Sequence, residues 1–181
     1  RAGAAVSDRP RRLAGINGTG TIPDWEAYAA ELSNRLGRDN KLIRGIATKA
    51  KQNTKRIVFA EADTYKILKE AQAARDEGIA KPILLGEVEK INRLIQENSL
   101  DFGDTPIIDP RDASQEDNRT RFGELFYQKQ KRKGFTPYES KKVMTERNYF
   151  GAMMVETGMA DGMISGLTRK YGAPIKPALQ C

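Results

Sequence analysis

Short apolar runs, spaced along the chain from Arg56 onward, are its clearest pattern. Each is rich in β-branched or large aliphatic side chains and too short for a helix, so we predict three buried strands. They occupy residues 56–59 (Arg-Ile-Val-Phe), 82–86 (Pro-Ile-Leu-Leu-Gly) and 106–110 (Pro-Ile-Ile-Asp-Pro). Strands of this kind are typical of parallel sheets that are covered on both faces.

Amphipathic segments separate these runs. Apolar residues recur every three or four positions over residues 67–74 and 88–95, which predicts a helix after each of the first two strands. We expect Asp63 to cap the first helix and Gly78 to end it in the left-handed conformation. Further helices are predicted at Phe122, Leu125 and Phe126, ending at Gly134, and around 137–146 and 148–157.

A local repeat supports a sheet of parallel strands. Residues 77–86 run from a helix end through a glycine to a strand and a second glycine, and residues 157–166 repeat that order. The order helix, short turn, strand and glycine is typical of β-α-β units. The predicted fold class is therefore α/β, an open and mostly parallel sheet with helices on both faces.

The leading part of the chain has a different character. Residues 1–23 are rich in Gly, Arg and Pro without a sustained period, which is typical of a tail or linker. Residues 24–54 are predicted to form a helical adaptor, with a first helix that ends at Gly37 and a second over 39–52. The predicted α/β domain then occupies residues 55–181.

Composition bounds the chemistry. Of the 181 residues, 39% are hydrophobic, which is enough to bury a core. No apolar run approaches the roughly 18 residues of a membrane span. The sequence has no histidine, which excludes Ser–His and Cys–His catalysis and histidine zinc sites. The single cysteine, Cys181, excludes an intrachain disulfide framework and fits a reducing compartment.

The positive charge is unevenly distributed. The formal net charge is +7, but residues 1–55 hold 11 basic and 5 acidic side chains, whereas residues 56–181 hold 20 and 19. Nucleic-acid binding by the folded part requires a basic surface interleaved with aromatic side chains. The charge balance of the predicted domain therefore disfavours that function.

A binding site is expected where the predicted strands end, because ligands of open parallel sheets bind beyond the carboxyl ends of the strands. Ala60-Glu61, Gly86-Glu87 and residues 165–168 fall there. The last carries hydroxyls, a glycine that allows close backbone approach and nearby cations, which suit phosphate or another anion. The alternative is an ordinary turn with solvated cations. The predicted ligand-binding residues are Ser165, Gly166, Thr168, Arg169 and Lys176, with no catalytic or metal-binding residue assigned.

Other clusters favour structural roles. The basic run at 129–133 lies at a predicted helix end, where cations stabilise the helix dipole. The apolar side chains of residues 150–154 are expected in the core. The acidic residues at 109–117 are expected in caps and loops, since their spacing is not that of a calcium loop. Asp161 is expected in a turn.

Several blocks of sequence resemble the phosphate acetyl/butyryl transferase family. They lie in the order and at the spacing of that family, at residues 55–61 (Lys-Arg-Ile-Val-Phe-Ala-Glu), 78–86, 132–136, 151–155, 160–166 and 177–180. The resemblance covers most of the predicted α/β domain. It implies acetyl-CoA or an acyl phosphate as the ligand.

The residues ahead of the transferase-like segment indicate a more specific class of protein. Residues 22–28, with two predicted helices ahead of the transferase-like start, resemble the junction in bacterial hybrid malic enzymes. This implies a regulatory, oligomer-forming domain of an NADP-dependent malic enzyme, which is inhibited by acetyl-CoA and converts malate to pyruvate by oxidative decarboxylation. It also implies a cytoplasmic homo-oligomer. The charge balance and the lack of a long apolar run argue against nucleic-acid and membrane partners. NADP and Mg or Mn are expected in the malic enzyme domain of the parent, and no cofactor in this segment.

Two departures qualify what the resemblance implies. Lys176 stands where transferases carry arginine, and lysine lacks the bidentate fork that arginine offers a phosphate. The chain stops at Cys181, where the family continues into a second half, so we expect a fragment that is not catalytically competent alone. Two alternatives stay open. One is a phosphate acetyltransferase, which transfers acetyl between CoA and phosphate, and the other is a non-enzymatic assembly module.

Overall fold

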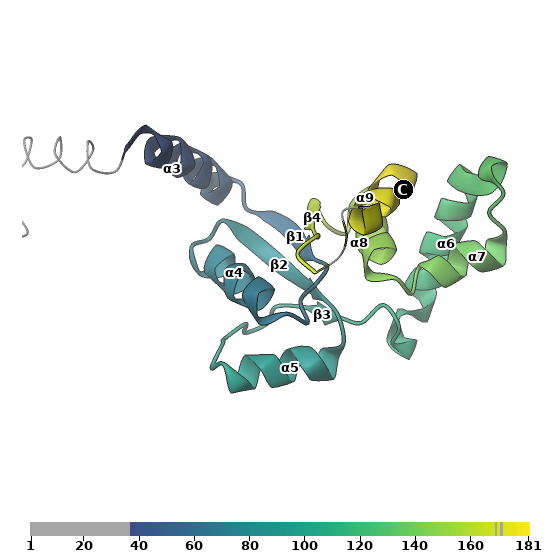
Figure 1. The fold of residues 1–181 in the computed structure, drawn as a ribbon, viewed down its shortest axis with the longest axis horizontal. Coiled ribbons are helices and arrows are strands. Elements are labelled where there is room, and N and C mark those ends of the chain that lie inside the picture. Colours follow the sequence, from purple (N-terminus) through teal and green to yellow (C-terminus); the bar gives the residue numbers. More distant parts are fainter. Residues whose placement is uncertain (1–36, 169, 171) are drawn as a thin grey trace, which may run out of the picture. The chain divides into compact units, whose positions relative to one another are not determined.

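The computed structural model describes residues 37–168, 170 and 172–181 (Figure 1). The predicted tail and the first adaptor helix lie outside the described residues, as does Arg169. The fold below therefore concerns the second adaptor helix and the predicted α/β domain.

The second adaptor helix is α3 (Gly37–Gln52), which was predicted over 39–52. By its internal contacts the chain divides after Ile46, and the second unit, residues 47–181, holds the whole sheet. The apolar positions that predicted α3 are largely exposed, namely Leu42, Ile43 and Ile46.

Four parallel strands form the sheet, in the order β3-β2-β1-β4 (Figure 1). β1 (Lys55–Phe59) lies between β2 (Ala80–Leu85) and β4 (Gly162–Ile164), and β3 (Ile107–Ile108) pairs with the other side of β2. Every connection between the strands passes through at least one helix, as parallel pairing requires. The predicted open parallel sheet is confirmed.

Helices join the strands close to the predicted positions. α4 (Tyr65–Asp76) connects β1 to β2, and α5 (Val88–Glu97) connects β2 to β3. Between β3 and β4 lie η1 (Ala113–Gln115), α6 (Glu116–Gln130), η2 (Lys131–Lys133), α7 (Pro137–Val143) and α8 (Arg147–Glu156), and α9 (Gly172–Gln180) follows β4. In the part of the chain that the structure describes, no helix has the length and apolar character to span a membrane.

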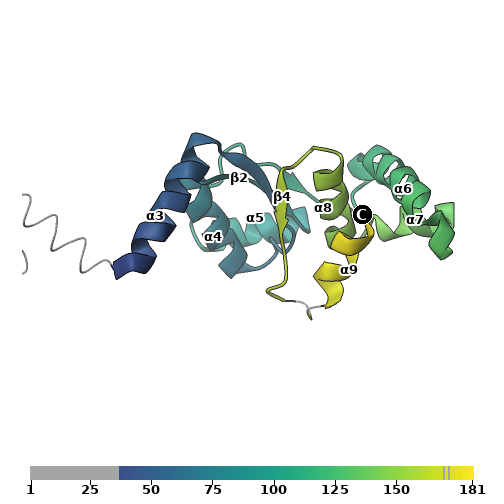
Figure 2. The same cartoon turned by 90° about the horizontal axis from the view of Figure 1, so that it is seen from above.

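Helices cover both faces of the sheet (Figures 1 and 2). Successive strand residues point to opposite faces, so Val58 and Ile83 pack against α6 and α8, whereas Phe59 and Leu84 pack against α4 and α5. The first cluster contains the buried side chains predicted for the core, namely Phe150, Met153 and Met154. The two clusters make this a three-layer fold with the sheet in the middle.

Two local signals at α4 have different outcomes. Gly78 follows the helix with φ +69°, so the predicted left-handed end is confirmed. The predicted cap at Asp63 is wrong, because Thr64 is the N-cap residue and forms no side-chain cap bond. The carboxylate of Asp63 instead pairs with Arg147 at 2.6 Å, a contact across the fold that turns it away from the first turn of the helix.

A second long-range ion pair holds the start of β1 to the start of β4. The carboxylate of Asp161 accepts hydrogen bonds from the backbone N–H of Arg56 at 2.8 Å and from its guanidinium at 3.2 Å. In return, the N–H of Asp161 donates to the carbonyl of Arg56 at 2.8 Å. These hydrogen bonds from Arg56 lower the pKa of Asp161 to about 2. Asp161 lies at a bend and also fixes the register of the edge strand.

Two of the acidic residues near β3, Asp109 and Asp112, have the local roles that were predicted, whereas Glu116 pairs with Lys141 of α7. The carboxylate of Asp112 accepts from the N–H of Ser114 at 2.8 Å and caps η1, and that of Asp109 accepts from the N–H of Arg111 at 2.8 Å. Among the described residues, no group of three or more His, Cys, Asp or Glu side chains is arranged to hold a metal ion. These carboxylates therefore organise the turn that leads into α6.

Close packing of α7 on α6 depends on Gly123. A Cβ atom at Gly123 would lie 2.8 Å from the Cα atom of Lys141 and 3.1 Å from its backbone nitrogen. Backbone atoms cannot turn aside as a side chain does, so any larger residue must push the two helices apart.

We therefore expect Gly123→Ala to lower the free energy of unfolding by about 1–3 kcal/mol, the usual cost of overpacking a core. Urea denaturation followed by circular dichroism measures this. Gly45→Ala in α3 is the matched control, because a Cβ atom there meets nothing within 4 Å. If both variants kept full stability, the close approach of α6 and α7 would be wrong.

Candidate functional site

The carboxyl ends of β1 and β4 meet at one edge of the sheet. Their parallel pairing continues one residue past β1, where the N–H of Ala60 donates to the carbonyl of Ile164 at 3.1 Å. Glu61 follows on the first strand and the loop 165–168 follows on the second. The topology thus brings together residues that are 104 positions apart in the sequence.

The carboxylate of Glu61 is the acceptor on which this edge converges. Glu61 is only 3% exposed. Its Oε1 accepts from the N–H of Gly166 at 2.8 Å and from the hydroxyl of Ser165 at 3.0 Å. Its Oε2 accepts from the N–H of Thr168 at 2.6 Å and from the hydroxyl of the same residue at 2.7 Å. These donors replace the water that a carboxylate loses on burial.

Asn148, at the start of α8, is the second buried polar group at this edge. It is 5% exposed, and its Oδ1 lies 2.8 Å from the hydroxyl oxygen of Ser165. The Ser165 hydroxyl has one proton and so donates to Glu61 or to Asn148, but not to both at once. When it turns to Asn148, the carboxylate of Glu61 still keeps three donors.

Two opposing effects set the pKa of Glu61. Burial raises the pKa, because it penalises the charged form. The hydrogen bonds from Thr168, Gly166 and Ser165 favour the charged form and outweigh burial, so the pKa lies below its ordinary value of 4.5. Glu61 is therefore an ionised structural acceptor at neutral pH rather than a proton donor.

The structure brings three of the five predicted ligand residues together. Ser165, Gly166 and Thr168 converge on one anionic group, and that group is the chain's own carboxylate at Glu61. Lys176 lies exposed on α9, and Arg169 is outside the described residues. Donors suited to an anion were thus identified from the sequence, and the tertiary structure identifies an internal acceptor for them.

An ion-pair cluster lies beside this edge. Asp63 Oδ1 pairs with Arg147 of α8 at 2.6 Å, and Asp63 Oδ2 pairs with Lys90 of α5 at 3.3 Å. Burial raises the pKa of Asp63, but hydrogen bonds and charge from Arg147 and then Lys90 outweigh it and lower that pKa. The loop after β2 joins the same edge, where the N–H of Ala62 donates to the carbonyl of Leu85 at 3.2 Å.

The sequence offered a partial signal for these residues. Glu61 and Asp63 follow a predicted buried strand, and acidic side chains at a strand end indicate a functional or structural cluster. Asn148 and Arg147 stand at the start of a predicted helix without any motif, so only the packing of α8 against the sheet identifies their roles.

Comparisons with known proteins agree with this architecture. The sequence profile described as phosphate acetyl/butaryl transferase matches residues 41–181. The phosphate acetyltransferase of Thermoanaerobacterium thermosaccharolyticum is 36% identical over 139 residues, which cover 77% of this chain and 41% of that protein. The phosphotransacetylase of Streptococcus pyogenes superposes with a TM-score of 0.71 at 31% identity, covering 77% of this chain and 41% of that one.

Relatives of both kinds match a longer part of the chain. The phosphate acetyltransferase of Helicobacter pylori is 30% identical over 161 residues, which cover 86% of this chain and 30% of that protein. The NADP-dependent malic enzyme of Rhizobium meliloti is 29% identical over 161 residues, which cover 88% of this chain and 21% of the enzyme. The chain therefore spans about two fifths of the Thermoanaerobacterium and Streptococcus proteins and about one fifth of the malic enzyme.

The buried carboxylate predicts the effect of Glu61→Gln on stability. The amide replaces one acceptor oxygen by a donor that faces the N–H of Thr168 or of Gly166. We expect the free energy of unfolding at pH 7 to fall by about 1–3 kcal/mol, the cost of a buried polar group without a partner. Urea denaturation measures it, with Glu70→Gln on the exposed side of α4 as the control. Equal stability of the two variants would contradict this role of Glu61.

The lowered pKa predicts how this difference depends on pH. Since the folded state holds the pKa of Glu61 below 4.5, ionised Glu61 stabilises the fold above that pH, and the contribution is lost as pH falls through the lower folded value. The stability gap between the wild type and Glu61→Gln should therefore be constant near neutral pH and shrink in acid. Urea titrations at a series of pH values test this, and a gap that widened in acid would refute it.

Proposed function

The chain belongs to the phosphate acetyl/butaryl transferase family, and on that premise we propose that it is the first part of the regulatory domain of an NADP-dependent malic enzyme. The observation that supports this proposal is the likeness to malic enzymes, which begins ahead of the transferase-like segment. The match to the malic enzyme covers more of the chain than residues 41–181 provide, so it includes residues ahead of the transferase segment. The match to the phosphate acetyltransferase of Helicobacter pylori also extends there, so the length of the match supports the second candidate below equally. The proposed parent converts malate to pyruvate by oxidative decarboxylation.

In this proposal the segment binds a ligand and the chemistry takes place elsewhere. NADP and a divalent metal belong to the malic enzyme domain of the parent. The segment supplies an acyl-CoA or acyl phosphate pocket and contributes to a homo-oligomer. Its effect on malate oxidation is regulatory, with acetyl-CoA as the inhibitor.

The proposed pocket lies at the edge where β1 and β4 end. Ser165 is the donor that a ligand oxygen recruits at least cost, because Glu61 keeps three other donors when that hydroxyl turns away. Gly166 permits close approach of the ligand to the backbone, and Thr168 holds the loop on Glu61. Arg169 and Lys176 supply the positive charge that offsets phosphate, Lys176 as a point charge without a fork.

Phosphate acetyltransferase is the second candidate, favoured by the likeness to transferases in both sequence and structure. In such a reaction the CoA thiolate attacks the carbonyl carbon of acetyl phosphate, and the acyl–phosphate bond breaks to release inorganic phosphate. The protein then has to position two anions and stabilise the tetrahedral oxyanion. The same loop would serve as part of that site in a complete domain.

Inhibition of the intact parent by acetyl-CoA tests the first proposal. We expect Ser165→Ala combined with Arg169→Ala to raise the acetyl-CoA concentration for half-inhibition by about tenfold or more, the effect of losing a charge-assisted contact. Arg93→Ala, which removes one exposed cation from α5, is the matched control. Absence of inhibition in the wild type, or inhibition unchanged in the double variant, would refute the proposal.

A coupled assay with acetyl phosphate and CoA separates the two candidates. The regulatory proposal predicts no acetyl transfer above background by the intact protein, whereas a phosphate acetyltransferase turns over both substrates. Turnover that disappears in the Ser165→Ala and Arg169→Ala variant would establish the second candidate in place of the first.

A further inference from the structure

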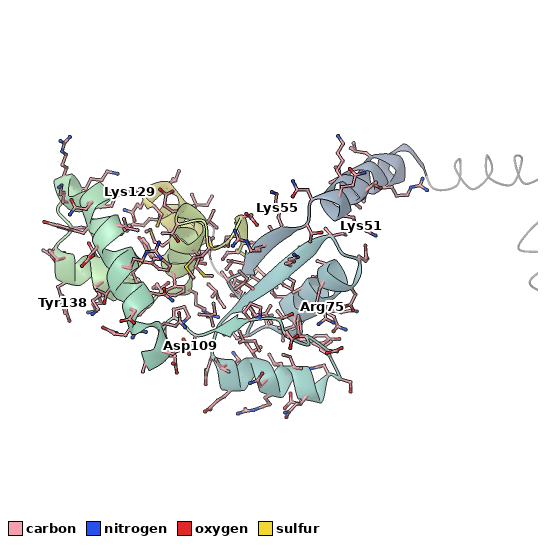
Figure 3. The ribbon with its side chains drawn as sticks, turned by 180° about the vertical axis from the view of Figure 1, so that it is seen from behind. Lys51, Lys55, Arg75, Asp109, Lys129 and Tyr138 are labelled. Atoms are coloured by element: carbon pink, nitrogen blue, oxygen red, sulfur yellow. The ribbon has the colours of Figure 1, made fainter. Side chains whose placement is uncertain are left out.

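A cavity of about 330 Å³ lies away from the sheet edge, where the turn before α6 meets α7. Figure 3 labels Tyr138 on this side of the molecule, on α7. The cavity is lined by one acidic and four basic residues with a tyrosine and a threonine, namely Glu116, Arg111, Arg119, Lys141, Lys142, Tyr138 and Thr145. None of these residues belongs to the Glu61 edge, so this is a separate candidate site.

One wall of the cavity is rigid and already paired. Arg119 is 8% exposed, and its guanidinium donates to the carbonyls of Pro110 and Asp112, each at 2.6 Å. It also pairs with Glu116 at 2.6 Å, and Lys141 pairs with the other oxygen of the same carboxylate. Glu116 thus offsets part of the charge of these two cations, and their heads are held in place.

The remaining two cations have no such partner. Arg111 and Lys142 are exposed, and within the described residues neither side chain forms a hydrogen bond or an ion pair. Together with the wall they leave a clear excess of positive charge around one concave space. Because an arginine fork and a lysine point charge both favour phosphate oxygens, this excess suits a ligand with more than one negative charge.

Tyr138 adds an apolar plane at the rim. Its side chain is 75% exposed although it is large and aromatic. It precedes Lys141 by three positions on α7, so the ring and the cations lie on adjacent turns of one helix. An exposed aromatic ring beside cations is the arrangement on which the bases of nucleotides stack while their phosphates are neutralised.

We propose that this cavity binds a nucleotide, with its phosphates held by Arg111 and Lys142 and its base stacked on Tyr138. Arg119 and Lys141 are held in place by their shared pairing with Glu116, and two cations against one carboxylate leave the wall positive. The close approach of α6 and α7 at Gly123 sets the distance between the two walls. This site does not depend on the regulatory function proposed above, because it shares no residue with the Ser165 loop.

Isothermal titration calorimetry with ADP, pyrophosphate and adenosine at low salt tests the proposal on the full chain. ADP is expected to bind with a dissociation constant below about 1 mM and pyrophosphate more weakly, with adenosine the weakest of the three. Arg111→Ala combined with Lys142→Ala should weaken ADP and pyrophosphate by about tenfold, since two exposed charge contacts are lost. Tyr138→Ala should weaken ADP about fivefold or more and leave pyrophosphate nearly unchanged.

Lys66→Ala combined with Lys69→Ala is the matched control, because it removes the same charge from the exposed side of α4. Binding of ADP reduced equally by both double variants would show only a general charge effect and would overturn the site. A Tyr138→Ala variant with an unchanged ratio of ADP to pyrophosphate affinity would overturn the stacked base. No binding of ADP below about 1 mM would overturn the whole proposal.

Discussion

A buried carboxylate that needs donors is the constraint on which the binding edge of this fold depends. Glu61 is buried because it lies two residues after the end of β1, a central strand that is covered on both faces. An ionised group there is tolerated only if hydrogen bonds replace its water. The loop after β4 supplies them from two backbone N–H groups and two hydroxyls. The pairing of β4 with β1 therefore also places the hydrogen-bond donors that Glu61 needs.

The two ends of the β1–β4 pair are secured in the same way. At the amino ends, Arg56 and Asp161 exchange backbone and side-chain hydrogen bonds. At the carboxyl ends, Glu61 accepts hydrogen bonds from the loop that holds Ser165, and Asp63 forms an ion pair with Arg147 of α8. A strand of three residues at the edge of a sheet offers few backbone bonds of its own. Charge-assisted contacts at both ends therefore hold β4 in register.

Internal carboxylates satisfy the hydrogen-bond donors and cations of two places in this chain to different extents. At the carboxyl ends of β1 and β4, the carboxylate of Glu61 accepts the hydrogen bonds of the loop 165–168. An external anion therefore has to compete with Glu61 for these donors or bind beside it. Between the turn at Arg111 and α7, the internal carboxylate of Glu116 meets only part of the positive charge. The first arrangement favours order in the loop, and the second leaves attraction for a ligand. This difference is why we assign regulation by an acyl ligand and nucleotide binding to separate places.

Local pattern determined the strands, the helices near them, the glycine end at Gly78 and the buried cluster around Phe150. These features depend on neighbours within a few residues, and short-range periodicity carries them. The donors of the Ser165 loop were also visible in sequence. Their acceptor, the diversion of Asp63 from capping to Arg147, and the cavity beside Tyr138 were decided only by tertiary structure. Each depends on a contact between helices, strands or loops that are distant in the sequence. The residue types in a sequence do not show which of these elements pack together.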